Sequence, residues 1–434
     1  MSQRYQGGIL GVGFNPLQAP DAPTIGTATS STGTTASVAF TAPANVGGSA
    51  ITSYVVQSTP GNIGATGSSS PITVSGLTTG TAYTFRVTAL NSYGPSRISA
   101  SSNSVTPTQF IAVAHAGSPF INVYPWSGSG FGTKFADPAT LPTGAGNAVA
   151  FTSGRDAIAV AHSTSPFVTA YPWSGSGFGT KFTNPATLPT GQGNGVAFTA
   201  AGNAIAVAHN TSPFVTAYPW SGSGFGTKFA NPATLPTNFG LGVAFTAAGN
   251  AIAVAHQSSP NITVYAWSGS GFGSKFANPG TLPNGFGYGA AFNPSGNALA
   301  VAHNNSPNIT AYPWSGSGFG TKFADPATLP AGNGRGVAFT PAGDAVAVAH
   351  GTSPFISAYP WSGSGFGTKF ADPATLPPNI GYGVAFNPTG NAIAVAHSNS
   401  PCVTAYPWSG SGFGTKFSDP ATLPIAAGNG VAFI

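Results

Sequence analysis

Short segments in which hydrophobic residues alternate with polar or small residues run through most of this chain. "GVAFT" (195–199) alternates, "AIAVAH" (204–209) places Ile205 and Val207 on one face and alanines on the other, and "FVTAYPW" (214–220) is aromatic and β-branched. Glycine, serine, asparagine and proline separate the segments. A period of two between turn-forming residues predicts strands joined by hairpins, and no segment has the period of a helix.

The same pattern recurs at a fixed interval over the C-terminal three quarters of the chain. Every tryptophan, histidine and lysine repeats with a step of 47 residues, as in Trp126 and Trp173. A fourth segment of each repeat, such as "TKFANPATLP" (227–236), is expected to be an outer strand, because proline is tolerated at a sheet edge. Four strands in each of seven repeats predict a seven-bladed β-propeller.

The two ends of the repeat region predict how the ring closes. The first repeat begins at "FIAVAH" (110–115) without a preceding "GVAF" strand, and "GNGVAFI" (428–434) supplies such a strand at the C-terminus. We therefore expect residues 430–434 to complete the blade that begins at Phe110. We expect the alanine-rich face of one blade to pack on the larger apolar side chains of its neighbour.

The repeat resembles one known family. "GVAFTPAGDAVAVAH" (336–350), followed by "ISAYPW" (356–361), is similar to the strand–turn–strand pattern of WD-repeat propellers that ends in tryptophan. This resemblance covers about residues 110–434 and implies a scaffold-like function. No aspartate follows the tryptophan, and the histidine closes the second strand instead of opening the repeat, so the His–Asp network of that family is not carried over.

The N-terminal quarter predicts a separate all-β domain. "SGLTTGTAYTFRVTALNSYG" (75–94) resembles fibronectin type III domains, which are mostly spacers or binding modules. The resemblance implies a sandwich over residues 20–107, with Leu77 in the core and Tyr83 at the corner. Val38 and Phe40 stand where the family usually has a tryptophan.

Residues 1–19 are expected to be an anchoring peptide, ahead of the sandwich (20–107) and the propeller (108–434). The segment has no apolar stretch of about 7–15 residues like that of a signal peptide, so we expect no ordinary secretory export. Its candidate anchor residues are Arg4, Tyr5, Ile9, Leu10 and Phe14.

Composition excludes several partners. Charged residues make up 4% of the chain, there is no glutamate, and the net charge of +5 comes without any run of lysine or arginine. We therefore expect no nucleic-acid binding. No apolar stretch approaches the roughly 18 residues that span a bilayer, so no membrane insertion is expected. The single cysteine, Cys402, excludes an intrachain disulfide framework and is expected to be a packed thiol.

The repeated phrase "SGSGFGTKF" is not a nucleotide site, because its spacing differs from that of a phosphate-binding loop and it precedes a strand. The histidines are expected to make structural hydrogen bonds, with ligand contact as the alternative. The lysines are expected to form a solvated face, which is also a candidate contact for anionic surfaces. Asp and Asn interchange at one position of the repeat, as in Asp137 and Asn184, which predicts a hydrogen-bonding turn residue.

No set of side chains suited to catalysis stands apart from the repeats. We find no separate pair of carboxylates, no Ser–His–acid set and no cluster of metal ligands. The sequence therefore predicts no enzymatic activity, no metal and no cofactor.

Two turns vary from repeat to repeat, the one after the histidine and the one after "ATLP". In a propeller both turns emerge on the same face, so that face is diversified. An arc of aromatic residues with one arginine suits sugar stacking or a protein contact, and relaxed constraint on surface loops is the alternative explanation. The candidate binding residues are Phe239, Leu241, Phe286, Tyr288, Arg335, Ile380 and Tyr382.

Three functions stay open, and the leading hypothesis is a non-enzymatic surface-display protein with an anchoring peptide, a sandwich spacer and a propeller head. The combination of domains resembles a bacteriophage virion protein, such as a capsid decoration or fibre, which implies a location on the virion, capsid or tail proteins as partners of residues 1–19, and a head that faces host or environment. A multivalent lectin for cell-surface glycans, with one site per blade around its Trp and His, is the second. An intracellular protein-interaction scaffold is the third, and the sequence leaves oligomerisation open.

Overall fold

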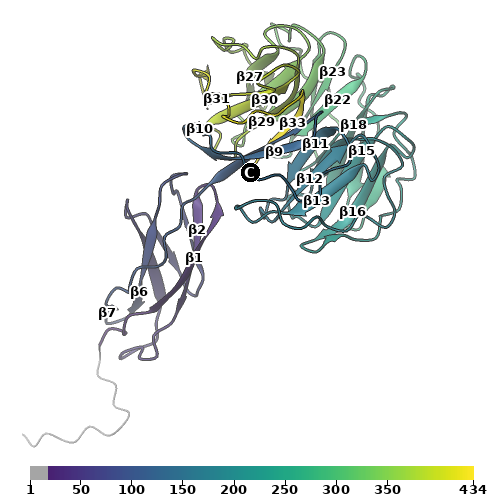
Figure 1. Ribbon diagram of the computed structural model, residues 1–434. Coiled ribbons are helices and arrows are strands. Elements are labelled where there is room, and N and C mark those ends of the chain that lie inside the picture. Colours follow the sequence, from purple (N-terminus) through teal and green to yellow (C-terminus); the bar gives the residue numbers. More distant parts are fainter. Residues whose placement is uncertain (1–17) are drawn as a thin grey trace, which may run out of the picture. The chain divides into compact units, whose positions relative to one another are not determined.

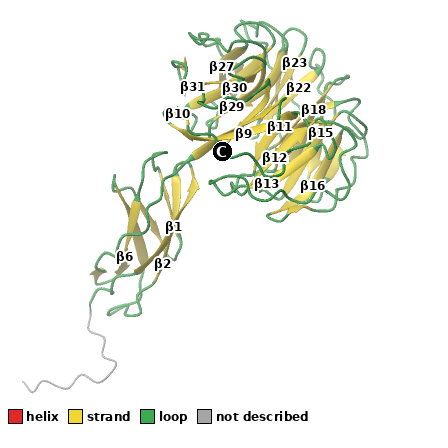
Figure 2. Ribbon diagram, viewed as in Figure 1, coloured by secondary structure: helices red, strands yellow, loops and turns green. Residues whose placement is uncertain are grey.

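The computed structural model describes residues 18–434, and these residues form strands and turns without any helix (Figure 2). The chain divides into two compact units, Met1–Thr108 and Gln109–Ile434. The predicted anchor residues fall within positions 1–17 and therefore lie outside the described residues.

The first unit is a sandwich of two antiparallel sheets with strand orders β1-β2-β5 and β4-β3-β6-β7. Tyr83, expected at the corner, is 3% exposed, and its Oη accepts a hydrogen bond of 3.0 Å from the backbone N–H of Thr78. Leu77, Val38 and Phe40 are also buried, as expected of core positions. The strands are β1 (Thr24–Thr32), β2 (Thr35–Thr41), β3 (Ser53–Thr59), β4 (Gly64–Gly67), β5 (Ile72–Ser75), β6 (Thr84–Asn91) and β7 (Gly94–Pro95).

The second unit is a seven-bladed β-propeller, in which each blade is one antiparallel sheet (Figure 1). The innermost strand of each blade contacts the innermost strands of its two neighbours. These inner strands are β33 (Gly428–Phe433), β11 (Gly146–Phe151), β14 (Gly193–Phe198), β18 (Gly240–Phe245), β22 (Gly287–Phe292), β25 (Gly334–Phe339) and β29 (Gly381–Phe386).

The second strand of each blade is the most buried one, because sheets pack on both of its faces. Second strands are β8 (Gln109–His115), β12 (Ala157–His162), β15 (Ala204–His209), β19 (Ala251–His256), β23 (Ala298–His303), β26 (Ala345–His350) and β30 (Ala392–His397). Third strands are β9 (Ile121–Ser127), β13 (Val168–Pro172), β16 (Val215–Ser221), β20 (Ile262–Trp267), β24 (Ile309–Pro313), β27 (Ile356–Ser362) and β31 (Val403–Ser409).

The outer strand differs from the prediction. "TKFANPATLP" was expected to form it, but in most blades it consists of the two residues Gly-Phe just before that segment, and in two blades it is a single bridge, such as Trp173 to Phe178. The segment still makes one bond to the third strand, from the N–H of Phe229 to the carbonyl oxygen of Ala217, and Pro232 has no N–H with which to continue the pairing. The outer strands are β10 (Gly130–Phe131), β17 (Gly224–Phe225), β21 (Phe272–Lys275), β28 (Gly365–Phe366) and β32 (Gly412–Phe413).

The C-terminal strand closes the ring, as predicted. β33 pairs antiparallel with β8, and the yellow C-terminal strand lies next to the blue first strands of the propeller (Figure 1). Phe110 and Ile434 exchange both backbone hydrogen bonds, at 2.9 and 3.0 Å. The first blade is therefore built from both ends of the repeat region.

Blades pack through the predicted pairing of small and large faces. Ala157, Ala159 and Ala161 of β12 lie in one apolar cluster with Ile205 and Val207 of β15 in the next blade. Burying a side chain such as isoleucine or valine stabilises the fold by about 1.5–3 kcal/mol. The tryptophans also lie in this interface. Around Trp220 the rings of Phe182, Phe198 and Phe225 have centroids at 5.0–5.2 Å from its own, and these rings come from two blades.

Candidate functional site

The inner strands approach one another closely around the propeller axis. A Cβ atom on Gly242 would lie 2.7 Å from the carbonyl oxygen of Tyr288, and one on Gly336 would lie 2.8 Å from that of Tyr382. Such distances leave no room for a side chain, so glycine allows neighbouring inner strands to pack this tightly. The residue just before each of these glycines is the one that reaches the axis.

One residue of each inner strand lines a cavity of about 250 Å³ at the axis. A second cavity, of about 260 Å³, is lined by the same residues and by the two that follow each of them. The seven axial residues, spaced 47 apart, are Asn147, Asn194, Leu241, Tyr288, Arg335, Tyr382 and Asn429. We call the space lined by these seven residues the axial pocket.

One side of the axial pocket is built from amides. Asn147, Asn194 and Asn429 come from three consecutive blades, and each donates a hydrogen bond from Nδ2 to the first residue of the next inner strand. The acceptors are the carbonyl oxygens of Gly193, Gly240 and Gly146, at 2.8–2.9 Å. The Nδ2 groups thus tie neighbouring blades together, and the amide oxygens of Asn147 and Asn429 are available to a ligand. The amide oxygen of Asn194 accepts a hydrogen bond of 3.3 Å from Nε2 of Gln192.

The opposite side of the axial pocket is aromatic and cationic. The guanidinium carbon of Arg335 lies 5.3 Å from the ring centroid of Tyr288 and 5.0 Å from that of Tyr382. Contacts of this kind between a guanidinium and an aromatic face are attractive. Leu241 adds an apolar surface beside Tyr288.

The structure separates the predicted binding residues into two groups. Leu241, Tyr288, Arg335 and Tyr382 line the axial pocket, so they converge on the axis instead of spreading along an exposed arc. The other three, Phe239, Phe286 and Ile380, lie one residue before an inner strand and do not line the pocket.

Those three residues instead connect the two variable turns of their blades. The carbonyl oxygen of Phe239 accepts a hydrogen bond from the N–H of Gln257, the residue after the blade's histidine. Phe286 and Ile380 accept the equivalent bonds from Asn304 and Ser398. The two variable turns therefore lie on one face of the propeller, where Phe239 and Phe286 are 39% and 42% exposed.

Sequence reasoning missed the three asparagines of the pocket. They stand in "GAGNAVAF", "GQGNGVAF" and "AAGNGVAF", where asparagine after glycine is typical of a turn. The signal that would have found them is their spacing, because each stands a multiple of 47 residues from Leu241, Tyr288 and Arg335.

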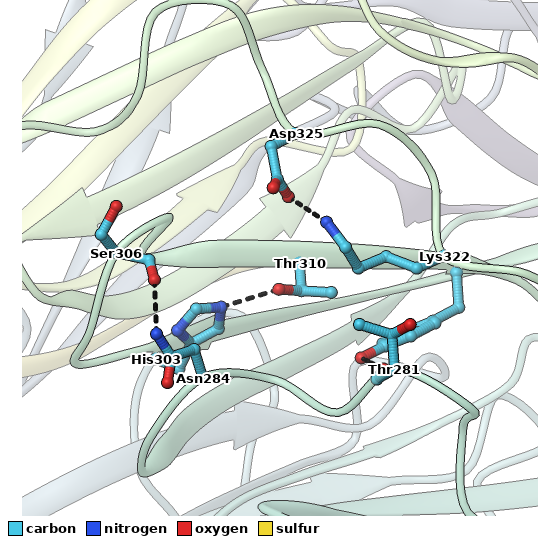
Figure 3. A network of polar contacts seen from close by, with 8 residues as sticks. Thr281, Asn284, His303, Ser306, Thr310, Lys322 and Asp325 are labelled. Carbon is cyan, nitrogen blue, oxygen red and sulfur yellow. Dashed lines mark hydrogen bonds and ion pairs between the residues drawn. The ribbon is translucent and has the colours of Figure 1, made fainter.

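The histidines are buried in the fold, and Nε2 of six of them lies within hydrogen-bond distance of a Thr or Ser hydroxyl, whereas His115 makes no such bond. His303 is fully buried, and its Nε2 lies 2.8 Å from the Thr310 hydroxyl, as Figure 3 shows. Burial lowers the pKa of His303 to about 4, because it disfavours the charged imidazolium. All seven histidines are fully buried in this way, which leaves them no contact with a dissolved ligand in this structure.

The tryptophans are equally inaccessible. They are 2–6% exposed. The fully buried tyrosine two residues before each of them donates a hydrogen bond from Oη to a threonine carbonyl oxygen, as from Tyr218 to Thr187 of an "ATLP" segment at 2.8 Å. A sugar site built in each blade around Trp and His therefore has no open surface among residues 18–434.

The lysines differ from the expected solvated face. Each Nζ donates to an Asp or Asn three residues later, such as Lys322 to Asp325 (Figure 3) or Lys181 to Asn184. In the four ion pairs the lysine side chains are only 13–20% exposed. Asp and Asn interchange at this position because either side chain supplies the Oδ1 acceptor.

Residues 18–434 contain no group of three or more His, Cys, Asp or Glu side chains placed to hold a metal ion. Over the same residues, no helix has the length and apolar character needed to cross a membrane. Cys402, the single cysteine, is buried with 4% of its surface exposed.

Comparison with known proteins identifies the first unit. Residues 21–105 match the family model of the fibronectin type III domain. No curated protein is significantly similar in sequence to this chain.

Solved structures resemble the propeller in fold. A protein from Lactobacillus plantarum is 17% identical, with a TM-score of 0.61, and the match covers 75% of this chain and 99% of that one. A candidate 6-phosphogluconolactonase from Bacteroides fragilis is 11% identical, with a TM-score of 0.59 and coverage of 75% and 98%. The periplasmic gluconolactonase of Pseudomonas aeruginosa is 12% identical, with a TM-score of 0.58 and coverage of 75% and 99%. At these identities the likeness concerns the fold alone.

These neighbours correct the prediction that the chain has no enzymatic activity. That prediction rested on the absence of a recognisable catalytic set in the repeats. Because the same fold occurs in proteins named as lactonases, the exclusion was wrong. Its weakness is physical, since a site assembled from single residues 47 positions apart has no local sequence motif.

Proposed function

We propose that this chain is a display protein whose propeller head binds a carbohydrate ligand in the axial pocket, with the fibronectin type III domain as a spacer. The observation that carries the proposal is the convergence of Tyr288, Arg335 and Tyr382 on one side of a cavity of about 250 Å³. At this position the seven repeats carry Asn, Leu, Tyr or Arg, so the ring is one of the places where the blades differ in chemistry.

The lining suits a sugar. Aromatic rings contact the apolar faces of sugars, and the amide oxygens of Asn147 and Asn429 accept hydrogen bonds from hydroxyl groups. A concave pocket with a few convergent polar groups is the usual form of a small-ligand site. The small volume fits a single sugar residue, such as the end of a glycan chain.

The test is a glycan array probed with the full chain and two variants. Leu241→Trp fills the axial pocket, whereas Leu282→Asn changes an exposed leucine outside it. We expect the wild-type chain and Leu282→Asn to bind the same restricted set of glycans, and Leu241→Trp to lose them. Binding to no glycan, or equal binding by Leu241→Trp, contradicts the proposal.

A second candidate function is turnover of a sugar lactone in the same pocket. Two observations favour it. Two of the fold neighbours are named as lactonases, and the guanidinium of Arg335 in the pocket lining is a donor that can polarise a carbonyl oxygen. Release of acid from glucono-lactone by the full chain, above the rate with Arg335→Gln, supports this candidate. Equal rates for both chains reject it.

The setting we propose is the virion surface, with residues 1–19 contacting capsid or tail proteins. Its support is the resemblance in domain combination to bacteriophage virion proteins, together with the very low charge. The likeness of the repeats to WD-repeat propellers supports the third function, an interaction scaffold. Mass spectrometry of density-gradient fractions separates the two: co-migration with capsid and tail proteins supports the virion, and recovery only as free protein or in cell fractions rejects it.

A further inference from the structure

We infer that the ligand of the axial pocket carries a carboxylate, as an acidic sugar does, and that Arg335 binds it. This inference rests on the proposed carbohydrate site and names the class of its ligand. It follows from the two tyrosines beside Arg335, from its unpartnered Nε donor and from the absence of a carboxylate in the pocket lining.

Arg335 lies between two aromatic rings of the pocket lining. Tyr288 and Tyr382 lie on either side of it in the ring of inner strands, with ring centroids 5.3 and 5.0 Å from Cζ. The tyrosine rings cannot accept strong hydrogen bonds from the guanidinium N–H groups, and the planar fork of these donors matches a carboxylate in a two-point contact.

One N–H donor of Arg335 has no partner in the protein. Nε of Arg335 is buried and has no hydrogen-bond acceptor among residues 18–434. A buried donor without an acceptor is unfavourable, so an acceptor oxygen supplied by a ligand at Arg335 would stabilise the site.

No carboxylate of the described chain neutralises Arg335. The propeller has six aspartates: four pair with lysines, and Asp156 and Asp344 accept hydrogen bonds from Thr152 and Thr340 at the far ends of inner strands. No acid lines the axial pocket. Arg335 is thus the one charged group of the lining, and a single cation suits a singly charged carboxylate better than a doubly charged phosphate.

The rest of the lining completes the fit to an acidic sugar. Asn147 and Asn194 lie across the axis from Arg335 in the order of the blades, and the amide oxygen of Asn147 is an acceptor for the hydroxyl groups of a sugar. Leu241 provides an apolar contact for the C–H groups of the sugar ring. A ligand with its carboxylate on Arg335 and its hydroxyls toward the asparagines uses both sides of the pocket.

The test compares methyl glucuronide with methyl glucoside, which differ in the carboxylate, by isothermal titration of the full chain. We expect glucuronide to bind at least about tenfold more tightly, since a charge-assisted hydrogen bond contributes that much or more. Raising the salt concentration should narrow the difference. Arg335→Gln should reduce glucuronide affinity to that of glucoside, Arg335→Lys should keep part of it, and Arg97→Gln, an exposed change in the sandwich, should keep all of it.

The outcomes separate the inference from the proposed function. Equal affinity for the two sugars, or unchanged glucuronide affinity in Arg335→Gln, overturns the carboxylate inference and leaves the carbohydrate site standing. Binding of neither sugar overturns both. The thermal unfolding midpoint of each variant is measured as well. A variant with the wild-type midpoint is folded, so its loss of affinity is then due to the binding site.

Discussion

The hydroxyl of Tyr124 donates a hydrogen bond of 2.8 Å to the carbonyl oxygen of Thr422, a residue 298 positions later in the chain. In the other blades the equivalent bond joins residues only 31 apart, as from Tyr171 to Thr140. The same contact between neighbouring blades is thus local around most of the ring and long-range where the ring closes. Ile111 and Val113 of the first blade likewise pack on Ala392 and Ala394 of the last.

Removal of the closing strand should open the propeller. A chain ending at residue 427 lacks β33, so the edge of β8 loses its partner and exposes a buried, apolar strand. We expect a lower thermal unfolding midpoint and association of chains, measured by calorimetry and by size-exclusion chromatography. A chain lacking residues 1–17 is the matched control and should keep both properties of the full chain. A truncated chain that stays monomeric with an unchanged midpoint contradicts this closure.

The propeller should lose stability in mild acid. Burial lowers the pKa of each of the seven histidines to about 4. In the unfolded chain the value is about 6.5, so between these two values the unfolded state binds more protons and stability falls as the pH falls. Each histidine accounts for up to about 3 kcal/mol over that range, at about 1.4 kcal/mol per pKa unit.

Calorimetry between pH 7.5 and pH 5 tests this expectation within one molecule. The sandwich unit contains no histidine, so its transition serves as an internal reference while the propeller transition moves to lower temperature. His303→Gln should make the propeller's midpoint less dependent on pH. A propeller midpoint that does not change over this range is the opposite result.

Alanine between blades should not tolerate a larger side chain. Ala206 is fully buried in a cluster with Ile252 and Val254 of the next blade. Ala206→Leu forces extra volume into that interface and should destabilise the propeller by about 1–3 kcal/mol. Ala200→Leu, at an exposed turn, should change stability by less than about 0.5 kcal/mol. Equal effects of the two changes in chemical denaturation would show that blade packing is not tight.

Glycine at the axis should matter for the shape of the pocket. In Gly336→Ala the new Cβ would lie 2.8 Å from the carbonyl oxygen of Tyr382, so the two inner strands must move apart. We expect lower stability and weaker ligand binding, because Tyr382 packs on Arg335. Ala148→Gly, at the equivalent position of another blade, removes a Cβ and should leave binding nearly unchanged. Wild-type affinity in Gly336→Ala is the contrary outcome.

Most of the fold could be predicted because the local residue pattern of each repeat predicts the strands of its blade. The alternation in "AIAVAH", the 47-residue step and the unpaired segments at the two ends were enough for seven blades and for closure by β33. The outer strand was misplaced by a few residues because its ladder begins inside the preceding Gly-rich hairpin, where Phe225 pairs with Trp220, and the hydrophobic pattern does not report that pairing.

The candidate site could be predicted only in part. Variation between repeats pointed to the turn that contains Phe239 and Leu241, but it did not say which of the two reaches the axis. That depends on the glycine beside Leu241 and on the close approach of neighbouring inner strands, which is a property of the closed ring. Asn147 and its equivalents escaped notice because an asparagine after glycine is typical of any turn.

The most direct test of the account is the number of ligands that one chain binds. Titration of the full chain with methyl glucuronide should give one site per chain, because the seven blades contribute one residue each to a single axial pocket. Leu241→Trp should abolish that site. Several equivalent sites per chain, or a site that persists in Leu241→Trp, would contradict the axial pocket as the binding site.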